Sequence, residues 1–570
     1  MFICAVLWNP YSLSADIDCL IKGMKKMRDT SISRGSRLVK RQALSFALLA
    51  LTFSAPFHCV DSLYARAPQA IPLDQLDAPV GGASTDMFGQ SISMNTDFGA
   101  VGTPGLNVTV GGVVHLKQGG VHIYNNAGNG IFNFQGTLTP SNGTANDGCG
   151  MSVAALPGWV VAGAPGRNIV TSAVPPNQLQ AGIVWVWRYG AAGWEFPPFE
   201  LQHPDPKSID LFGSSVALSQ QSVDGIVRST IVVGAPGDNV IYTDCGSVCV
   251  FEWNLSSQQW DRTAFISPPT IAGEGPELIA YGLFGSSVAI SGDYMVIGAK
   301  RQTLGVSKQG TAFVFRRNTL SNPAPNILQI NPAWGDWVLV QRLTALTPLP
   351  DEAFGTSVSL SAWNLCVGAP GGSTSAGSVS IYDLDNSQGR FVFDAQLFAV
   401  SGHAGDQFGA SVVLKSSALL IGAPGVDAGA GSTQLTNRGL AYVFTRDSTS
   451  CQNWEQGLSY FPPPNANVAE AAFGSAIDLT SDDVAISAPK GDNQQLGQGV
   501  VFTFVLNTIS CPTDLSGDGG VSAEDILILF SHWGGCGSDD QVADYNNDGC
   551  VDGVDLTFLF EAWGACICGN

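Results

Sequence analysis

Two acidic stretches near the C-terminus have the spacing of calcium-binding loops. In each, oxygen-bearing side chains stand at positions 1, 3, 5, 9 and 12 of the loop. A glycine at position 6 allows the sharp turn that a chain makes when it wraps around an ion, and calcium prefers oxygen ligands, so the pattern predicts two calcium sites. The residues are Asp514, Ser516, Asp518, Ser522 and Asp525 in the first loop, and Asp544, Asn546, Asp548, Asp552 and Asp555 in the second.

The alternative interpretation of these loops is an acidic turn that binds no metal. It requires the five oxygen-bearing positions and the glycine to coincide twice by chance. We therefore expect calcium at both loops. Binding should be weaker at the first, where Ser516 and Ser522 stand in place of Asn546 and Asp552.

Each loop is followed by an apolar segment, 526–530 after the first and 556–560 after the second. The same part of the chain also contains five cysteines. A small exported domain has little core, and disulfides would stabilise it. Zinc binding is the weaker alternative, and the spacing leaves the pairing of the cysteines open. The cysteines are Cys511, Cys536, Cys550, Cys566 and Cys568.

The composition argues against a nucleic-acid-binding protein. The chain of 570 residues has a formal net charge of -21 at pH 7, whereas binding to phosphates needs clustered Lys and Arg. Its 67 glycines and its low share of charged residues, 13%, are typical of a turn-rich β protein. The length allows several domains or one large repeat architecture.

The first 67 residues have the features of an export signal behind an N-terminal extension. A basic region precedes the apolar run 43–57, which is too short to span a bilayer comfortably, so we expect a secreted protein without a transmembrane span. Residues 1–23 fit no part of a signal peptide, and this predicts translation from Met24 or Met27. Removing residues 1–67 leaves an exported chain with a net charge of -26.

One sequence unit occurs seven times in the body of the chain. Each copy begins with Phe-Gly, or with Cys149-Gly150 in the second copy. Gly-Ala-Pro or a close variant follows 13 residues after that glycine in six copies, and 21 residues after it in the third. A later glycine then opens a segment of alternating small or β-branched residues, which is typical of a strand. The Phe-Gly pairs begin at Phe88, Phe212, Phe284, Phe354, Phe408 and Phe473.

Four short strands in each repeat are typical of a β-propeller. The fourth strands are expected at 194–196, 337–343 and 391–398 in three of the copies. The last copy ends after its third strand, at Phe504, and residues 73–76 stand where a fourth strand would precede the first Phe-Gly. We therefore expect the two ends of the repeat region to complete one blade, which leaves no unpaired edge.

Over residues 71–507 the chain resembles the FG-GAP repeat family, the propeller also found in integrin α subunits. The resemblance implies a mainly β fold, a seven-bladed propeller of four-stranded blades, which we expect at residues 68–508. In the integrin pattern several blades insert a calcium loop between Phe-Gly and Gly-Ala-Pro. Here the turns at 291–294 and 480–483 leave no room for one, and the lone Asp224 in the longer third copy hardly restores it.

The tail at 511–570 resembles a type I dockerin, with two calcium loops 30 residues apart. The resemblance implies a small α-helical, EF-hand-like domain that binds two Ca²⁺ ions and docks onto a cohesin-like or cell-surface anchoring partner. Loop positions 10 and 11, Ala523-Glu524 and Gly553-Val554, differ from the Ser-Thr type of pair, which disfavours an ordinary cellulosomal cohesin. Further ligands implied by the resemblance are the backbone carbonyls of Gly520 and Cys550, with Ser522 and Asp552 acting directly or through water.

The repeated motifs themselves are expected to be structural, because Phe and Ala fill space between blades while Gly and Pro set turns. The variable residues after Gly-Ala-Pro are better candidates for binding, since they should lie in corresponding loops on one face of the disc. As ordinary turn formers they need no function. They stand at 166–168, 237–239, 371–373, 425–427 and 490–492.

No constellation typical of catalysis stands out. No pair of His residues has metal-ligand spacing, and His115 and His122 are expected to serve packing or surface roles. The Gly-Ser-Ser at 213–215 belongs to the repeat and is not a nucleophile elbow. Two carboxylates could still meet in the fold from distant positions, as they do in glycosidases.

Two functions therefore remain open. The preferred one is a secreted, non-catalytic binding or adhesion protein, whose propeller face binds a protein or glycan and whose calcium-loaded tail anchors it to a surface or scaffold. The alternative is an extracellular carbohydrate-active enzyme, a glycoside hydrolase or polysaccharide lyase, because dockerins often accompany such enzymes. Fold alone does not decide between them.

Overall fold

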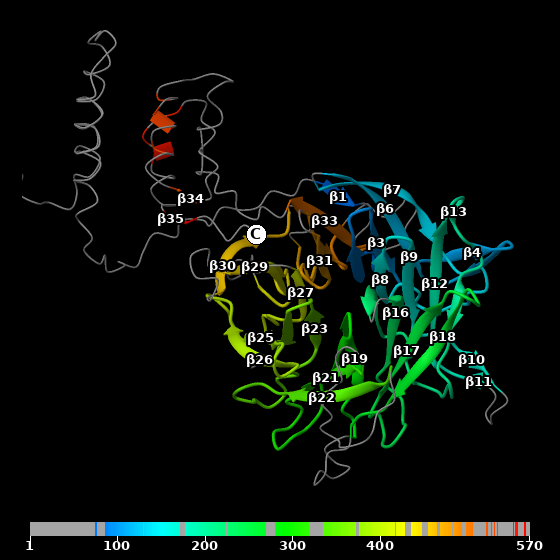
Figure 1. Cartoon of the computed structure of the whole chain (residues 1–570). Coiled ribbons are helices and arrows are strands. Elements are labelled where there is room, and N and C mark those ends of the chain that lie inside the picture. Colours follow the sequence, from blue (N-terminus) through cyan, green and yellow to red (C-terminus); the bar gives the residue numbers. More distant parts are fainter. Residues whose placement is uncertain are drawn as a thin grey trace, which may run out of the picture. The chain divides into compact units, whose positions relative to one another are not determined.

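A computed structural model shows the repeats as separate sheets arranged in a ring (Figure 1). The structure describes residues 74–76 and most of 86–505, together with isolated residues of the C-terminal tail, so the expected export signal lies outside the described residues. The gaps are 129, 172–176, 224–225, 270–279, 319–334, 372–374, 416–417, 428–434, 447–453, 464–467, 481–482 and 493–496, and the tail residues described are 520–521, 526, 529–530, 533, 551, 553, 555–556 and 564–565.

Seven antiparallel blades of four strands make up the propeller, which confirms the predicted fold class. In chain order, blade 1 holds β2 (Ser91–Met94), β3 (Phe98–Thr103), β6 (Gly120–Gly128) and β7 (Ile131–Leu138), and blade 2 holds β8 (Ser152–Leu156), β9 (Trp159–Ala164), β12 (Ile183–Gly190) and β14 (Phe199–Leu201). Blade 3 holds β15 (Ser215–Val223), β16 (Ile226–Ala235), β17 (Ser247–Asn254) and β18 (Gln259–Ile266). Blade 4 holds β19 (Phe284–Ser291), β20 (Tyr294–Ala299), β21 (Thr311–Arg317) and β22 (Trp337–Leu343).

The remaining three blades follow the same order of strands. Blade 5 holds β23 (Ser357–Leu360), β24 (Asn364–Ala369), β25 (Ser378–Asp385) and β26 (Arg390–Leu397); blade 6 holds β27 (Ser411–Lys415), β28 (Ala418–Ala423), β29 (Leu440–Arg446) and β30 (Trp454–Tyr460); and blade 7 holds β31 (Ile477–Leu479), β32 (Asp483–Ala488), β33 (Val500–Val505) and β1 (Asp74–Leu76).

Blade 7 closes the ring with strands from both ends of the repeat region, as the sequence predicts. The strand β1 pairs antiparallel with β33, with Gln75 opposite Phe502, and the two lie side by side in Figure 1. Side-chain hydrogen bonds then join blade 7 to blade 1: the Met94 amide donates to Asp478 Oδ2 at 2.6 Å, and Asn126 Nδ2 donates to Asp483 Oδ2 at 3.0 Å. The seam is therefore held by a shared sheet and by polar bonds across it.

The Phe-Gly motif couples each blade to the one before it. Phe212 is fully buried and forms a parallel bridge with Gly182, which opens the third strand of the preceding blade. Gly182 has a φ of +86°, and a Cβ there would stand 2.1 Å from the Phe212 carbonyl oxygen, so only glycine fits. The bridge between Gly119 and Cys149 shows that Cys149 takes the place of Phe in the second copy, as predicted.

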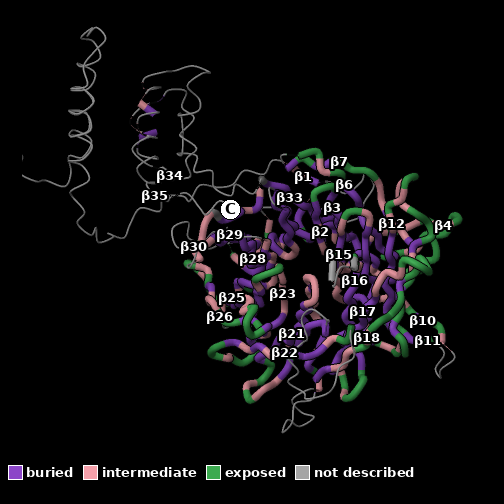
Figure 2. Tube along the Cα trace, viewed as in Figure 1, coloured by how far each residue is buried: buried purple, intermediate pink, exposed green. Residues whose placement is uncertain are grey.

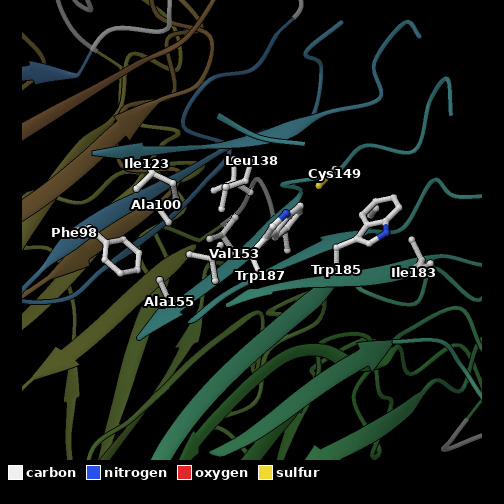
Figure 3. Packing of buried hydrophobic residues seen from close by; sticks show 14 of the residues in the cluster. Phe98, Ala100, Ile123, Leu138, Cys149, Val153, Ala155, Ile183, Trp185 and Trp187 are labelled. Atoms are coloured by element: carbon white, nitrogen blue, oxygen red, sulfur yellow. The ribbon is translucent and has the colours of Figure 1, made fainter. Parts of the chain in front are cut away.

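The core lies between neighbouring blades, where the strands are buried along most of their length (Figure 2). Between blades 1 and 2, Phe98 and Ile123 pack with Val153 and with two fully buried tryptophans of β12, Trp185 and Trp187 (Figure 3). Each such cluster draws residues from two blades, so a blade buries its faces only against its neighbours. This confirms the structural interpretation of the repeated Phe and Ala residues.

Two local features differ from the prediction. The fourth strand of blade 2 was expected at 194–196, but it is split into β13 (Gly193–Trp194) and β14, because Pro197 and Pro198 between them have no amide hydrogen to continue the ladder. Two extra hairpins, absent from the prediction, extend loops of blades 1 and 2. They are β4 (Val108–Val110) with β5 (Val113–His115), and β10 (Ile169–Val170) with β11 (Asn177–Gln178).

The described residues of the tail include helical positions in both expected segments, among them Leu529 and Leu556, and both side chains are buried. A short ladder joins β34 (Gly520–Val521) to β35 (Gly564–Ala565). The ring of Phe530 packs against Trp533 at 5.1 Å, which supports a packing role for this tryptophan. The five tail cysteines lie outside the described residues.

Candidate binding face of the propeller

One face of the propeller collects two sets of loops, and we call their described residues the loop face. The first set follows Gly-Ala-Pro and joins the second strand of a blade to the third, and the second set leads from one blade into the next Phe-Gly. Backbone hydrogen bonds tie the two sets together in each blade, for example Gly166 N to Asp147 O at 3.0 Å and Gly425 N to Asp406 O at 3.0 Å. The residues after Gly-Ala-Pro therefore share one face, as predicted.

Most of the predicted loop residues serve their own loops. Oδ1 of Asn168 accepts the Gln180 amide at 2.9 Å, and Oδ1 of Asn239 accepts the Asp244 amide at 2.7 Å. Asp427 and Asp492 accept amides of their loops in the same way. These side chains shape the loops, which matches their interpretation as turn formers. Residues 372–373 lie in a gap of the described chain.

The loop face carries exposed apolar side chains among its exposed polar ones. Tyr281 is 59% exposed and Leu346 is 58% exposed, although each belongs to a loop fixed by backbone hydrogen bonds. More than half of the exposed large hydrophobic residues of the described chain belong to these loops. They are Val113, Val114, Leu116, Val170, Leu179, Ile209, Val240, Ile241, Tyr281, Leu346, Leu349, Phe398 and Val400.

Buried carboxylates lie beneath this face, two residues before the Phe-Gly of most blades. Asp147 Oδ2 accepts the Thr144 amide at 2.6 Å, and Asp406 Oδ2 accepts the His403 amide at 2.7 Å, so each closes a tight turn. Arg167 adds an ion pair to Asp147 at 2.8 Å. Sequence inspection missed this position, although an acid recurs there at Asp86, Asp147, Asp210, Glu352 and Asp406.

Blade 3 holds a buried cluster of ionisable side chains that the sequence analysis also missed. His203 Nε2 lies 3.0 Å from Asp238 Oδ2 and its Nδ1 lies 3.8 Å from Asp210 Oδ2, while Ser247 Oγ donates to Asp238 Oδ2 at 2.7 Å. All four residues are at most 4% exposed. Two carboxylates do converge here, but they are closed to solvent, so the cluster holds the blade together and offers no substrate access.

The two carboxyl groups of this cluster have opposite pKa shifts. Burial raises the pKa of Asp210 to about 6, and its Oδ1 has no hydrogen-bond partner in the described chain. Burial also acts on Asp238, but the hydrogen bonds from His203 and Ser247 outweigh it and lower the pKa of Asp238. The cluster therefore keeps one carboxylate charged beside His203 while the other takes up a proton readily in mild acid.

The other histidines that the sequence singled out have packing roles. His122 is buried, contacts Thr137 Oγ1 at 2.7 Å, and has its pKa lowered to about 4 by burial. His115 Nδ1 lies 2.7 Å from the Gly143 carbonyl oxygen. Within the described part of the chain, no group of three or more His, Cys, Asp or Glu side chains is arranged to hold a metal ion.

Only two of the predicted calcium ligands lie among the described residues. Gly520 lies in β34, and Asp555 lies in a helical turn with its side chain fully buried. A carboxylate removed from water needs hydrogen bonds or a cation nearby, and a Ca²⁺ ion would supply that charge. The oxygen-bearing types of the predicted ligands are those that calcium prefers. The other predicted ligands lie outside the described residues and remain a prediction; they are Asp514, Ser516, Asp518, Ser522, Asp525, Asp544, Asn546, Asp548, Cys550 and Asp552.

Comparisons with known families match both parts of the chain. The FG-GAP repeat model matches residues 279–315 and 391–444, which contain the Phe-Gly pairs of blades 4 and 6. The Dockerin type I domain model matches residues 512–561, which contain both acidic loops. No curated protein sequence matches the chain significantly. No helix among the described residues is long and apolar enough to cross a membrane.

Several solved structures are similar to this chain, although their sequence identity to it is low. Three examples are Sqt1 from Saccharomyces cerevisiae, at 12% identity over 77% of this chain and 100% of that chain with a TM-score of 0.36; a putative 6-phosphogluconolactonase from Bacteroides fragilis, at 12% identity over 65% and 82% with a TM-score of 0.38; and a periplasmic gluconolactonase from Pseudomonas aeruginosa, at 14% identity over 66% and 85% with a TM-score of 0.39. Similarity this distant carries no information about activity.

Proposed function

We propose that this protein, a seven-bladed propeller of FG-GAP repeats joined to a type I dockerin domain, is an extracellular, non-catalytic binding protein. The loop face binds a protein partner. The tail, folded around two calcium ions, attaches the propeller to a cohesin-like or cell-surface partner. An export signal within residues 1–67, a propeller at 68–508 and a dockerin-like domain at 511–570 are part of this proposal.

The observation that carries the proposal is the concentration of exposed apolar side chains on the loop face. More than half of the exposed large hydrophobic residues of the described chain lie on this one face, and apolar side chains gathered on one face are typical of an interaction site. The described parts of the loops that carry them are fixed by backbone hydrogen bonds, such as Tyr281 N to Thr243 O at 2.8 Å, so a partner that binds there loses little affinity to the ordering of these parts. A protein partner can remove such side chains from water, whereas a strongly hydrated polysaccharide gains less from them.

The tail supports the anchoring half of the proposal. Type I dockerin domains bind calcium, dock onto cohesins and occur in extracellular proteins. The departures at loop positions 10 and 11, Ala523-Glu524 and Gly553-Val554, favour a partner other than an ordinary cellulosomal cohesin. In this arrangement calcium folds the attachment module and takes no part in ligand binding by the propeller.

The test compares variants of the two faces in the full chain with calcium present. Peptides that bind the wild type are first selected from a random-peptide phage library. Their affinity is then measured for the wild type and for two variants. Leu349→Asp changes the loop face, and Trp363→Asp changes the exposed tryptophan between β23 and β24 on the opposite face. We expect affinity to fall about tenfold or more for the first variant and to stay unchanged for the second.

The same test includes an assay for catalysis, in which a panel of polysaccharides is incubated with the full chain and released sugar is measured. Release of sugar from any member of the panel would contradict the non-catalytic assignment and would favour a glycoside hydrolase or lyase. Peptides that bind both variants as tightly as the wild type would contradict the assignment of the ligand to the loop face.

A further inference from the structure

Blade 4 departs from the other blades at three neighbouring positions of the loop face. Gly282 stands where five blades carry the buried acid, Lys300 replaces the proline of Gly-Ala-Pro, and Arg301 replaces the glycine that follows in most blades. The Arg301 amide donates to the Gly282 carbonyl oxygen at 3.2 Å, so the three changes meet in space. Blade 7 also lacks the acid, with Ala471 in its place, and has one cation, Lys490, at the position of Arg301; among the seven blades, only blade 4 has two cations at these positions.

No described acidic side chain pairs with either of these two cations. No hydrogen bond or ion pair reaches the side chain of Lys300 or Arg301 within the described chain, whereas Lys308 in the same loop pairs with Asp351 at 3.2 Å. Lys300 is half-buried, and burial, with the neighbouring Arg301 as a second cause, lowers its pKa. A half-buried ammonium beside a second cation gains free energy when an anionic group binds.

The loops next to the two cations carry exposed apolar side chains. Hydrogen bonds join these loops to their neighbours. Tyr281 N donates to Thr243 O at 2.8 Å, two residues after Ile241, and Asp351 N donates to Ser307 O at 3.0 Å. Leu346 and Leu349 lead into the second of these loops. We call the resulting set the blade-4 patch; its members are Ile241, Tyr281, Lys300, Arg301, Leu346 and Leu349, all exposed except the half-buried Lys300.

We propose that the blade-4 patch binds an acidic peptide segment of the protein partner, with Asp or Glu side chains on Lys300 and Arg301 and apolar side chains on the flanking residues. This inference rests on the proposed function and specifies its ligand. Tyr and Arg are the residues that most often anchor protein interfaces. An acidic polysaccharide could pair with the cations, but it would leave Leu346, Leu349 and Ile241 without apolar partners.

The repeat itself supplies substitutions that remove the charges without disturbing the fold. Lys300 occupies the second position of a turn in which Gln302 N donates to Ala299 O at 3.1 Å, and the same turn in blade 3 accommodates Pro236. Lys300→Pro and Arg301→Gly therefore restore residues that other blades already carry. Lys308→Ala removes one paired cation from the same loop and is the matched control.

The experiment measures peptides from the phage selection above, and also polygalacturonate and heparin, against the full chain and these variants. We expect selected peptides to combine Asp or Glu with apolar residues, to lose about tenfold in affinity with Lys300→Pro plus Arg301→Gly, and to weaken as salt is raised. Lys308→Ala should bind like the wild type.

The outcomes separate this inference from the proposed function. The inference would be overturned, with the loop face still the binding face, by peptides of one kind. These would bind Leu349→Asp more weakly than the wild type, carry no Asp or Glu, and bind the double variant as tightly as the wild type. Charge-dependent binding of only polygalacturonate or heparin would overturn the peptide ligand in favour of an acidic polysaccharide. Peptides that are insensitive to every loop-face variant would overturn both.

Discussion

Ala476 and Ser487 of blade 7 exchange the roles that a serine and a glycine have in the other six blades. In blade 6, Ser411 Oγ donates to the Gly474 carbonyl oxygen at 2.7 Å, and a Cβ on the paired Gly422 would stand 2.3 Å from that Oγ. In blade 7 the serine stands at the glycine position, and its Oγ accepts the Ala476 amide at 3.0 Å. One position of the pair can therefore be serine only if the other is small.

This relationship predicts strong coupling between the two positions. Ala476→Ser alone should lower the free energy of unfolding by about 1–3 kcal/mol, because its hydroxyl would collide with Ser487. Ser487→Gly alone should cost about 1 kcal/mol, since it removes the hydrogen bond to the Ala476 amide. The double variant should return close to the wild type in chemical denaturation, and additive losses would contradict the compensation.

The seam predicts that the N-terminal strand stabilises the whole ring. Leu76 is 4% exposed in β1, so Leu76→Ala should lower the free energy of unfolding by about 2–4 kcal/mol. Deleting residues 68–80 should lower the melting temperature markedly, because it also exposes the edge of β33. Val114→Ala, at an exposed loop position, is the control. A truncated chain with an unchanged melting temperature would show that β1 does not close the propeller.

The blade 3 cluster predicts a change in the pH dependence of stability. Because the pKa of Asp210 is raised to about 6, its protonated form favours the folded state at low pH, and that contribution is lost as the pH rises from about 4 through 6. Asp210→Asn should therefore gain up to about 3 kcal/mol relative to the wild type between pH 4 and pH 7. Denaturation at several pH values checks this, with exposed Asp205→Asn as the control; a pH-independent difference would contradict it.

The tail predicts two calcium ions with unequal affinities. Calorimetric titration of the full chain should give two sites, and Asp514→Ala or Asp544→Ala should each remove one. The site that remains in Asp544→Ala should be the weaker, because the first loop has Ser522 where the second has Asp552. Chelation should leave the melting of the propeller unchanged. An unaltered stoichiometry in both variants would refute the assignment of ligands.

The spacing of Phe-Gly and Gly-Ala-Pro was sufficient to predict seven blades and the closure at residues 73–76, because each motif marks a turn that the fold repeats. Local backbone chemistry explains the error in blade 2, where Pro197 and Pro198 split a strand that the aromatic pattern alone extended. The extra loop hairpins escaped prediction because their short strands have weak alternation.

The site was less predictable because it depends on residues that meet only in the folded chain. His203 and Asp210 come from the loop before β15 and Asp238 comes from the loop after β16, and nothing in their spacing along the chain indicates that they touch. Lys300 was visible as a departure from Gly-Ala-Pro, but its significance depends on Gly282, which the fold brings to the adjacent loop. The predicted calcium ligands follow a local pattern that can be recognised in the sequence, and their assignment stays a prediction.

In the proposed function the loop face, and not the opposite face, holds the ligand. Hydrogen–deuterium exchange of the full chain with calcium, with and without a selected acidic peptide, tests it most directly. The account predicts protection at 281–283, 300–303 and 346–353, and none at the turns 255–258 and 361–363 of the opposite face. Protection confined to those turns, or unchanged exchange at the loops while the peptide is bound, would contradict it.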